Sequence, residues 1–309
     1  MENGEAILLE PKGGKMISQR HSPNLNAMTL WKRLLRLVAI VILIPAMFLL
    51  GCQSSLIYLP NSYREGHKTM LSAAKGARVD FTTSQGRQTA FYIPPKARAP
   101  GLPRTIWLCF GGNGALALDW LPFTDAWDER FAYLLVDYPS YGDCAGKPTP
   151  GSIRESSKAA FKALVRHLNS TRDELQPRIA VLGHSLGSAA ALMAADDLDA
   201  RRAMLISPFT SMTDMGRIVL GWPLCHLNLH RFNNHKTLRH VASRAGARIV
   251  IFHGAADEVI PARMGRELAV AHPLAVTFHE IPEAHHNDIL ALIEGRIGQT
   301  MVEIMPPQP

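Results

Sequence analysis

Cysteine is scarce in this chain, with four residues among 309. Four cysteines are too few for the disulfide framework that holds small secreted domains together. About 255 residues follow the amino-terminal segment described below and contain many apolar runs, enough for one large hydrophobic core. Cys109 falls within one of these runs and is expected to be a small buried residue. No internal repeat is present, so a single non-repetitive domain is expected.

The chain also lacks the charge patterns of nucleic-acid-binding proteins. Its formal net charge is +7, from 33 basic and 26 acidic residues. The first 51 residues hold six basic and three acidic residues, so the remainder carries 27 and 23, a net charge of +4. No arginine-rich run and no basic stripe interleaved with aromatic residues occurs, so nucleic acid is not expected as a partner. This mildly basic surface suits an anionic membrane face.

Only one long uncharged apolar stretch is present, and it covers residues 37–51. Lys32, Arg33 and Arg36 precede it. A basic flank before a stretch of this length is typical of a secretory signal, because a full membrane span takes about 20 residues. Extended back to Leu34, the stretch can instead remain as a single uncleaved anchor. Either interpretation places the rest of the chain at a membrane surface.

The end of this stretch, Leu49-Leu50-Gly51-Cys52, resembles the lipobox of bacterial lipoproteins. In such proteins the signal is cut before the cysteine, and the thiol then receives a lipid. The resemblance implies lipidation of Cys52 and a location in the bacterial envelope, outside the cytoplasm. We therefore divide the chain into residues 1–51, a tail with a signal peptide or membrane anchor, and residues 52–309, a folded domain.

Strand-like and helix-like segments alternate along the folded domain. The strands are expected near residues 77–81, 88–93, 105–110, 131–137, 178–182, 203–207, 248–252 and 275–281. Helices are expected near residues 152–169, 186–196, 262–271 and 287–294. Such alternation predicts an α/β fold with a mostly parallel central sheet and helices on both faces.

The segment Gly183-His184-Ser185-Leu186-Gly187 has the pattern G-x-S-x-G and joins an apolar strand to a run of small, helix-favouring residues. This is the context of a nucleophile elbow, in which a tight turn raises a serine above the sheet. The turn forces the serine into strained backbone angles, and side chains two residues before and after it would collide with the neighbouring strand and helix. Gly183 and Gly187 avoid that collision, so Ser185 is the candidate nucleophile.

A serine nucleophile needs a carboxylate and a histidine base, which follow the serine in that order along the chain in such folds. Asp257 lies just beyond the strand at 248–252, and a carboxylate there can hold an imidazole in the required tautomer. Its neighbour Glu258 is the local alternative. His285 and His286 follow the last strand and compete as the base, and we favour His286. Of the other histidines, His184 occupies the variable position of the elbow and His253 is expected to pack at a strand end. Those at positions 226, 230, 235 and 240 have no matching partners, and all of these histidines are expected to be structural or exposed.

Acyl transfer also requires donors for the developing oxyanion. The backbone amide of Leu186, directly after the nucleophile, is expected to supply one. The second is expected from Asn113, in the loop where the strand at 105–110 breaks into glycines, with Gly112 next to it. A simple turn is the alternative interpretation of that loop.

These motifs resemble the α/β-hydrolase superfamily, and more narrowly its single-domain abhydrolase branch of serine hydrolases. The resemblance covers most of the chain from about Leu56. It is carried by Gln53-Ser-Ser-Leu-Ile-Tyr-Leu-Pro, Phe110-Gly-Gly-Asn-Gly, Asp137-Tyr-Pro-Ser-Tyr-Gly, Gly183-His-Ser-Leu-Gly, His253-Gly-Ala-Ala-Asp and His286-Asn-Asp. The sequence departs from the family pattern at two positions. Gly111 replaces the histidine that the family commonly has in the oxyanion loop, and His285 replaces the glycine that usually precedes the family's histidine.

The resemblance implies hydrolysis of an ester, thioester or amide through an acyl-serine, with no metal and no organic cofactor. It does not imply a substrate beyond a small molecule or an acyl chain. Two other functions use the same machinery or fold. A hydrolase-like scaffold can bind a partner or lipid without turnover, and an acyltransferase or peptidase can use the same three side chains.

Residues 208–246 fall where this fold inserts a cap between two strands. Their apolar side chains could line an acyl pocket or could seal the cap against the body; they are Met212, Met215, Ile218, Trp222, Leu224, Leu227 and Leu229. A cap this short leaves the site accessible, which suits small esters or acyl chains on larger molecules. Cys144 and Cys225 lie in loops that could approach the rim of the site, and a disulfide between them is an open alternative.

Overall fold

The computed structural model describes residues 25–97 and 100–305 of the chain. The described residues fall into two units, divided between Met47 and Phe48. The first contains the amino-terminal part of helix α1 (Leu25–Ile57), and the second contains the end of that helix and everything after it. Within the described residues, one segment, Thr29–Ile57, is long and apolar enough to cross a membrane.

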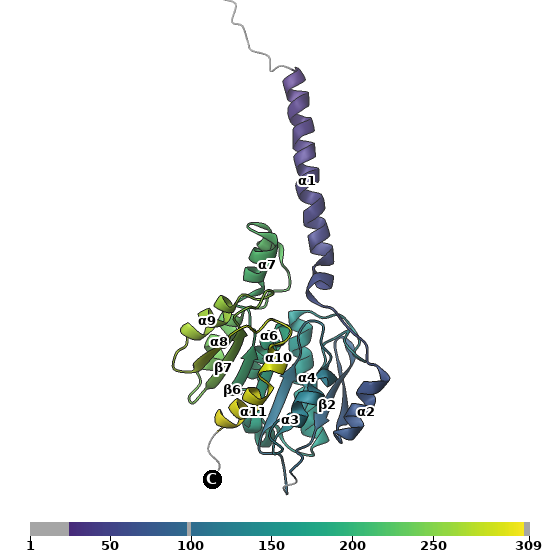
Figure 1. The fold of residues 1–309 in the computed structure, drawn as a ribbon. Helices are drawn as coiled ribbons and strands as arrows, with labels where there is room; N and C mark the ends of the chain where they lie inside the picture. The colour runs from purple at the N-terminus through teal and green to yellow at the C-terminus, as the bar shows by residue number, and fades with distance from the viewer. Residues whose placement is uncertain (1–24, 98–99, 306–309) are drawn as a thin grey trace, which may run out of the picture. The chain divides into compact units, whose positions relative to one another are not determined.

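The second unit is built on an eight-stranded sheet (Figure 1). Its spatial order is β1-β2-β4-β3-β5-β6-β7-β8. The strands are β1 (Ala77–Thr83), β2 (Gly86–Ile93), β3 (Ile106–Phe110), β4 (Ala132–Val136), β5 (Ile179–His184), β6 (Arg202–Ile206), β7 (Arg248–Gly254) and β8 (Val276–Ile281). β2 pairs antiparallel with β1 and β4, and all other pairs are parallel. The predicted strands and the mostly parallel α/β sheet are confirmed.

Strand β3 shows why the central strands read as continuous apolar runs. Side chains alternate between the two faces of a strand. Ile106, Leu108 and Phe110 join the core on one face of the sheet, and Trp107 and Cys109 join the core on the other. All five residues are buried, because helices cover both faces.

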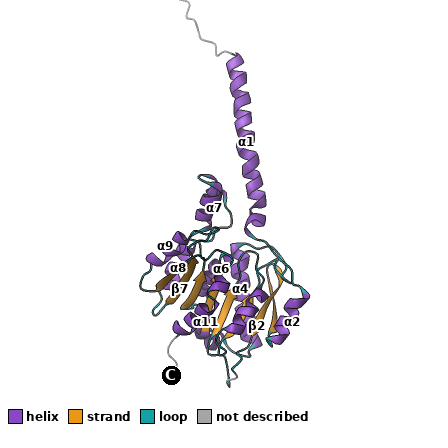
Figure 2. Cartoon of the chain, viewed as in Figure 1, coloured by secondary structure: helices purple, strands orange, loops and turns teal. Residues whose placement is uncertain are grey.

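Helices lie on both sides of the strands in Figure 2. The core on one face contains residues of α4 (Pro150–His167), α6 (Leu186–Asp197), α8 (Asn234–Ala242) and α9 (Ala262–Val270). The other contains residues of η1 (Ala117–Trp120), α3 (Leu121–Ala126), α10 (Ile289–Leu292) and α11 (Glu294–Glu303). The predicted helices at 152–169, 186–196 and 262–271 correspond to α4, α6 and α9. The one predicted at 287–294 is replaced by α10 and the longer α11.

Several helices have no counterpart in the sequence-based prediction. They are α2 (Glu65–Ala73), α3, α5 (Arg172–Leu175), α7 (Met212–Leu220) and α8. The short 3-10 helices η1, η2 (Gln176–Arg178) and η3 (Leu224–Leu227) are also new. The shortest of these segments, such as α5 and the 3-10 helices, do not let an apolar helical period repeat. α7 and α8 are amphipathic and as long as the predicted α9, so their pattern is a local signal that the prediction did not use.

The cysteines are all reduced, so the alternative of a Cys144–Cys225 disulfide is wrong for this structure. Cys144 is buried beside β2, where its sulfur accepts a hydrogen bond from the Thr89 N–H at 3.3 Å. Cys225 is buried in η3 and packs near Gly216 of α7. The two thiols are therefore buried in different parts of the fold. Cys109 is buried in β3, as expected.

Candidate active site

The turn between β5 and α6 carries Ser185 in a strained backbone conformation. Its φ is +56° and its ψ is −121°, angles that few residues other than glycine adopt. A Cβ atom on Gly183 would lie 2.1 Å from the Gly187 carbonyl oxygen, and one on Gly187 would lie 2.0 Å from the Phe110 carbonyl oxygen. Both glycines are therefore required by close backbone contacts, as the sequence pattern predicts for an elbow.

The loops at the carboxyl ends of three strands bring Ser185, His286 and Asp257 together. His286 Nε2 lies 2.9 Å from Ser185 Oγ, and His286 Nδ1 lies 2.8 Å from Asp257 Oδ2. All three residues are buried. Because a carboxylate only accepts hydrogen bonds, Nδ1 carries the imidazole proton, and Nε2 is free to accept the proton of the serine hydroxyl. The predicted candidates thus form one continuous chain of hydrogen bonds.

Asp257 is held as an anion by its surroundings. Burial raises the pKa of its carboxyl group, but contacts with His253 and His286 and the Ile260 N–H outweigh burial and place the pKa well below its ordinary value. Its Oδ1 accepts hydrogen bonds from the N–H groups of Val259 and Ile260, at 3.0 and 2.7 Å. These donors leave Oδ2 turned toward His286. His253 packs at the end of β7, as expected, with no exposed surface.

The neighbouring residues Glu258 and His285 form a separate pair. His285 Nδ1 lies 3.1 Å from Glu258 Oε2, and both side chains are more than half exposed. Glu258 also accepts a long hydrogen bond of 3.4 Å from the His286 N–H. The structure therefore directs His285 and Glu258 toward solvent and His286 and Asp257 toward Ser185.

His184 takes a part in the site that the sequence does not indicate. Burial, and next the charge of His286, lower the pKa of His184 to about 4, so its ring is neutral at physiological pH. Its Nε2–H donates to the His286 carbonyl oxygen at 3.1 Å, and the two rings lie 5.1 Å apart. His184 occupies the variable position of the G-x-S-x-G pattern, which says nothing about such a contact. This hydrogen bond helps to hold the His286 backbone in place.

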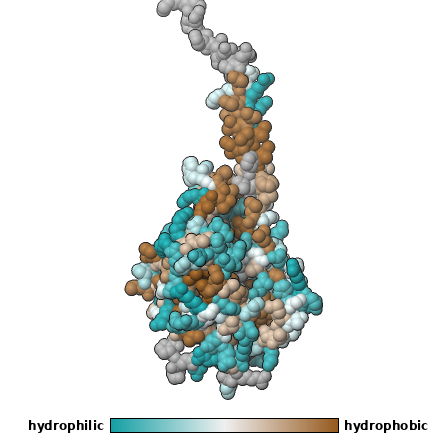
Figure 3. Space-filling model, viewed as in Figure 1, coloured by the Kyte–Doolittle hydropathy of each residue, from teal (hydrophilic) through white to brown (hydrophobic). Residues whose placement is uncertain are grey.

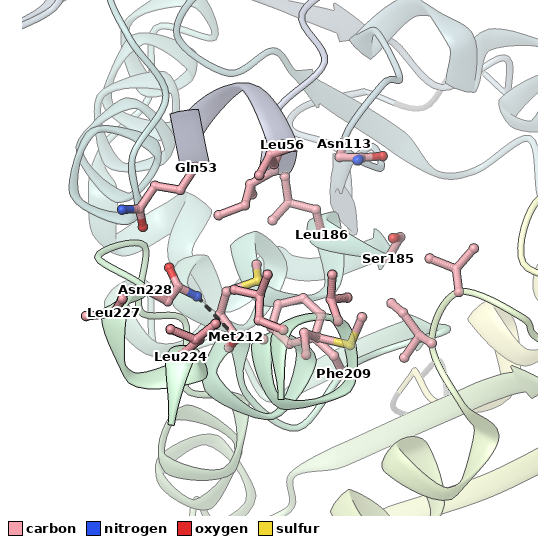
Figure 4. A pocket seen from close by; sticks show the side chains of 17 residues that line it. Gln53, Leu56, Asn113, Ser185, Leu186, Phe209, Met212, Leu224, Leu227 and Asn228 are labelled. Atoms are coloured by element: carbon pink, nitrogen blue, oxygen red, sulfur yellow. Dashed lines mark hydrogen bonds between the residues drawn. The ribbon is translucent and has the colours of Figure 1, made fainter. Parts of the chain in front are cut away.

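The expected oxyanion donors lie beside Ser185. Asn113 and Leu186 line the same cavity as Ser185. A Cβ on Gly112 would lie 3.6 Å from the Ser185 Cβ, so the loop after β3 passes directly beside the nucleophile candidate. The Asn113 carbonyl oxygen is occupied by the Leu59 N–H, at 2.9 Å, and by the Tyr141 hydroxyl group. These bonds fix the Asn113 peptide in the loop and leave its side chain at the cavity (Figure 4).

A cavity of about 260 Å³ opens at Ser185. Of the apolar cap residues named from the sequence, Met212, Met215, Leu224 and Leu227 line it. Ile218, Trp222 and Leu229 do not line it and are exposed. The sequence gives no hint of three further lining residues, Gln53, Leu56 and Ile57 at the end of α1. They belong to a segment that carries part of the family resemblance, but only the folded structure shows that this segment lies at the cavity.

Helix α8 is also part of the predicted insertion (residues 208–246), but it does not pack against the cavity. Leu238 and Val241 of α8 belong to the same buried core as the α6 alanines. α7 and η3 therefore cover the cavity, whereas α8 belongs to the helical layer over the sheet. No group of three His, Cys, Asp or Glu side chains in the described part of the chain is arranged to bind a metal ion.

Comparison with known proteins agrees with this architecture. A family model described as "Alpha/beta hydrolase family" matches residues 100–235, which include the loop after β3, the turn that carries Ser185 and most of the predicted cap. An uncharacterized protein of Mycobacterium tuberculosis, Rv2307c, is 28% identical over 271 residues, covering 86% of this chain and 92% of its own.

Two solved structures show the same fold. An α-β hydrolase from Vibrio vulnificus superimposes with a TM-score of 0.61 at 19% sequence identity, covering 79% of this chain and 88% of its own. The Pyrococcus furiosus esterase Pf2001 superimposes with a TM-score of 0.58 at 15% identity, covering 81% and 98%. These structures show the α/β-hydrolase fold, as predicted, and the family model agrees with the predicted resemblance over residues 100–235.

Proposed function

We propose that this protein is a membrane-associated serine hydrolase that cleaves carboxylic ester or thioester bonds. The observation that carries the proposal is the hydrogen-bonded chain from Ser185 Oγ through His286 to Asp257. Its three members lie where this fold places a nucleophile, a base and an orienting carboxylate. The esterase named among the structural relatives supports the reaction class by fold analogy.

In the first half of the proposed reaction, Ser185 Oγ attacks the carbonyl carbon of the substrate. His286 Nε2 takes the hydroxyl proton as the new carbon–oxygen bond forms. The Asp257 carboxylate stabilises the imidazolium ion, and its lowered pKa keeps it ionised while His286 is charged. The carbonyl oxygen becomes an oxyanion, for which the Leu186 and Asn113 N–H groups are the proposed donors.

The tetrahedral intermediate then collapses to an acyl-serine. His286 returns its proton to the departing alkoxide or thiolate, so the leaving group departs as an alcohol or thiol. In the second half, His286 removes a proton from water, and the hydroxide attacks the acyl carbonyl carbon. When this second intermediate collapses, His286 gives that proton to Ser185 Oγ, which releases the carboxylic acid and restores the Ser185 hydroxyl group.

The cavity next to Ser185 supports an acyl group as the bound part of the substrate. Its lining is mostly apolar and includes residues such as Leu186, Phe209, Met212, Met215 and Ile260. Apolar pockets of this kind bind by removing apolar surface from water and leave orientation to a few polar groups. Here Ser185 supplies the polar end.

Membrane attachment through the amino-terminal apolar segment is the second part of the proposal. The segment Thr29–Ile57 supports an uncleaved helical anchor. Cys52 lies within it, half-buried and reduced, and is the proposed attachment point of a lipid if the preceding signal is removed. Both modes put the residues directly after Cys52 at the membrane surface. Radiolabelled palmitate incorporation into the wild-type chain but not into Cys52→Ser would identify the lipidated form, and retention of residues 25–51 would identify the anchor.

The hydrolase proposal is tested with p-nitrophenyl esters and matching thioesters of graded chain length. We expect turnover of both classes, with kcat/KM rising as the acyl chain lengthens until the cavity is full. Absence of turnover with every ester and thioester, in a sample with a cooperative thermal transition, would refute the activity and favour a binding scaffold.

A further inference from the structure

The wall of the cavity includes two parts of the chain that are far apart in sequence. α7 and η3 of the cap provide one side, and the last turn of α1 provides another through Gln53, Leu56 and Ile57. Figure 4 shows Leu56 beside Leu186, with Met212 and Leu224 of the cap across the cavity. The end of the membrane-length segment is therefore part of the proposed acyl-binding site and not only a tether.

Three polar contacts fasten this turn of α1 and the residue that follows it to the cap. Gln53 Oε1 accepts a hydrogen bond from the Leu229 N–H at 2.7 Å. His230 lies between Ser54 Oγ, 2.9 Å from its Nε2, and Tyr58 Oη, 3.1 Å from its Nδ1. Tyr58 and His230 are buried. Burial lowers the pKa of His230, which favours the neutral ring that one donor and one acceptor can satisfy.

The outer surface of the cap beside this cavity is apolar. Large hydrophobic side chains are exposed there, with Trp222 at 76%, Val219 at 74% and Leu229 at 66%, together with Ile218 and, from α1, Leu56. In the space-filling view of Figure 3, hydrophobic residues gather over α7. We call Ile218, Val219, Trp222 and Leu229 the cap rim. Exposed groups of this kind on a soluble surface mark a contact with another apolar phase.

The position at which the apolar segment of α1 ends indicates that this apolar phase is the lipid bilayer. A helical span of about 20 residues, counted from Leu34 after the first basic pair, ends at Gln53. Gln53 is also the first residue of the cavity wall. The chain thus leaves the apolar segment at the residues that line the cavity. Lipidation at Cys52 would lead to the same place, because the lipid would be attached one residue before Gln53.

From these observations we propose that the cap rim rests on the bilayer and that the cavity receives the acyl chain of a membrane-resident ester. This inference rests on the proposed serine hydrolase activity and specifies its substrate. Tryptophan suits such a rim, since its ring is enriched at membrane interfaces. The chain enters the cavity from the bilayer, and its ester carbonyl lies at Ser185. Water cleaves the ester to a fatty acid and an alcohol by the steps described above.

The test compares a bilayer-resident substrate with a dissolved one. The full chain is reconstituted into vesicles of diether phosphatidylcholine, a lipid without ester bonds. The measured quantity is the kcat/KM for p-nitrophenyl palmitate in the vesicles divided by that for p-nitrophenyl butyrate in solution. Each methylene removed from water favours binding by about fourfold, so the cavity should make this ratio large.

Two variants and one control report on different parts of the proposal. Leu56→Trp enlarges an exposed side chain on the α1 wall and should lower the ratio about tenfold or more by shortening the cavity. Trp222→Ser alters the cap rim outside the cavity and should lower it about fivefold. Leu274→Ser removes a fully exposed leucine next to the amino-terminal end of β8, on the opposite edge of the sheet from Ser185, and should leave the ratio unchanged.

Failure of this inference is distinct from failure of the proposed activity. If butyrate is hydrolysed but both Leu56→Trp and Trp222→Ser keep the wild-type ratio, the bilayer substrate is wrong and the hydrolase stands. If Trp222→Ser instead abolishes chemical cross-linking between copies in dilute vesicles, the rim joins two copies, and the proposal is also overturned. Loss of butyrate hydrolysis in the wild-type chain would reject the hydrolase itself.

Discussion

His286 Nε2 lies 2.9 Å from Ser185 Oγ, although 101 positions separate the two residues in the chain. The sheet produces this approach. β5 and β8 run parallel in the same sheet, so the turn after β5 and the loop after β8 meet at one edge. Asp257, after the intervening strand β7, reaches the same place. The reactivity proposed for Ser185 therefore depends on three loops that the order of the strands places together.

The two adjacent histidines should differ sharply on substitution. His286→Ala removes the base beside Ser185 and should lower kcat for p-nitrophenyl butyrate by about 10⁴-fold or more. His285→Ala removes a half-exposed partner of Glu258 and should lower it less than about threefold. Steady-state kinetics on both purified variants make the comparison. A larger loss in His285→Ala would reassign the base.

Asp257→Asn should keep the position of the His286 ring but change which ring nitrogen carries the proton. The asparagine amide can donate to His286 Nδ1, which moves the imidazole proton to Nε2 and prevents it from accepting the serine proton. We expect kcat to fall by about 10⁴-fold while the thermal midpoint changes by a few degrees. Parallel kinetics and thermal denaturation test this. Near-wild-type kcat would show that Asp257 does not orient His286.

Gly187→Ala should destabilise the whole domain. The new Cβ would lie 2.0 Å from the Phe110 carbonyl oxygen, a backbone atom of β3 that cannot move alone. We expect a loss of more than about 4 kcal/mol in the free energy of unfolding. Gly151→Ala is the matched control, because its nearest neighbour would be Thr149 Oγ1 at 3.8 Å, and it should change stability by less than about 1 kcal/mol. Similar urea midpoints for the two variants would contradict the close elbow packing.

Asp137 should make stability depend on pH. Burial raises the pKa of its carboxyl group to about 7 from an ordinary value of 3.8, although hydrogen bonds from Tyr63 and the Ala117 N–H oppose the shift. Between these values the folded chain keeps a proton that the unfolded chain has lost, so the free energy of unfolding falls as pH rises and levels off above pH 7.

The decrease attributable to Asp137 between pH 5 and pH 8 should be on the order of 3 kcal/mol. Asp137→Asn cannot ionise and should lack this component. Urea unfolding of the wild-type chain and Asp137→Asn at both pH values measures the difference. Equal pH dependence in the two proteins would show that Asp137 is already ionised in the folded state at pH 5.

The parts of the fold that could be predicted share a regular local pattern. β3 and β5 are unbroken apolar runs buried on both faces, and the elbow glycines follow from backbone contacts at fixed spacing. Both patterns involve residues close together in the chain, so they can be recognised from a single sequence. The order Ser185, Asp257, His286 then follows from the connection of the strands.

The remaining features depend on contacts between distant residues. His184 acquires its contact only when the loop after β8 reaches it, and Gln53 meets Leu229 across 176 positions. Local propensity carries no information about such pairings. They emerge from tertiary packing.

The most direct measurement is intact-mass analysis after incubation with a fluorophosphonate, followed by peptide mapping, for the wild-type chain and Ser185→Ala. We expect the wild-type chain to gain one phosphonyl group on Ser185. Ser185→Ala should gain none, hydrolyse no ester, and melt within a few degrees of the wild-type chain. A folded wild-type chain that remains unmodified, or an adduct on another residue with undiminished turnover in Ser185→Ala, would contradict the assignment of Ser185 as the nucleophile.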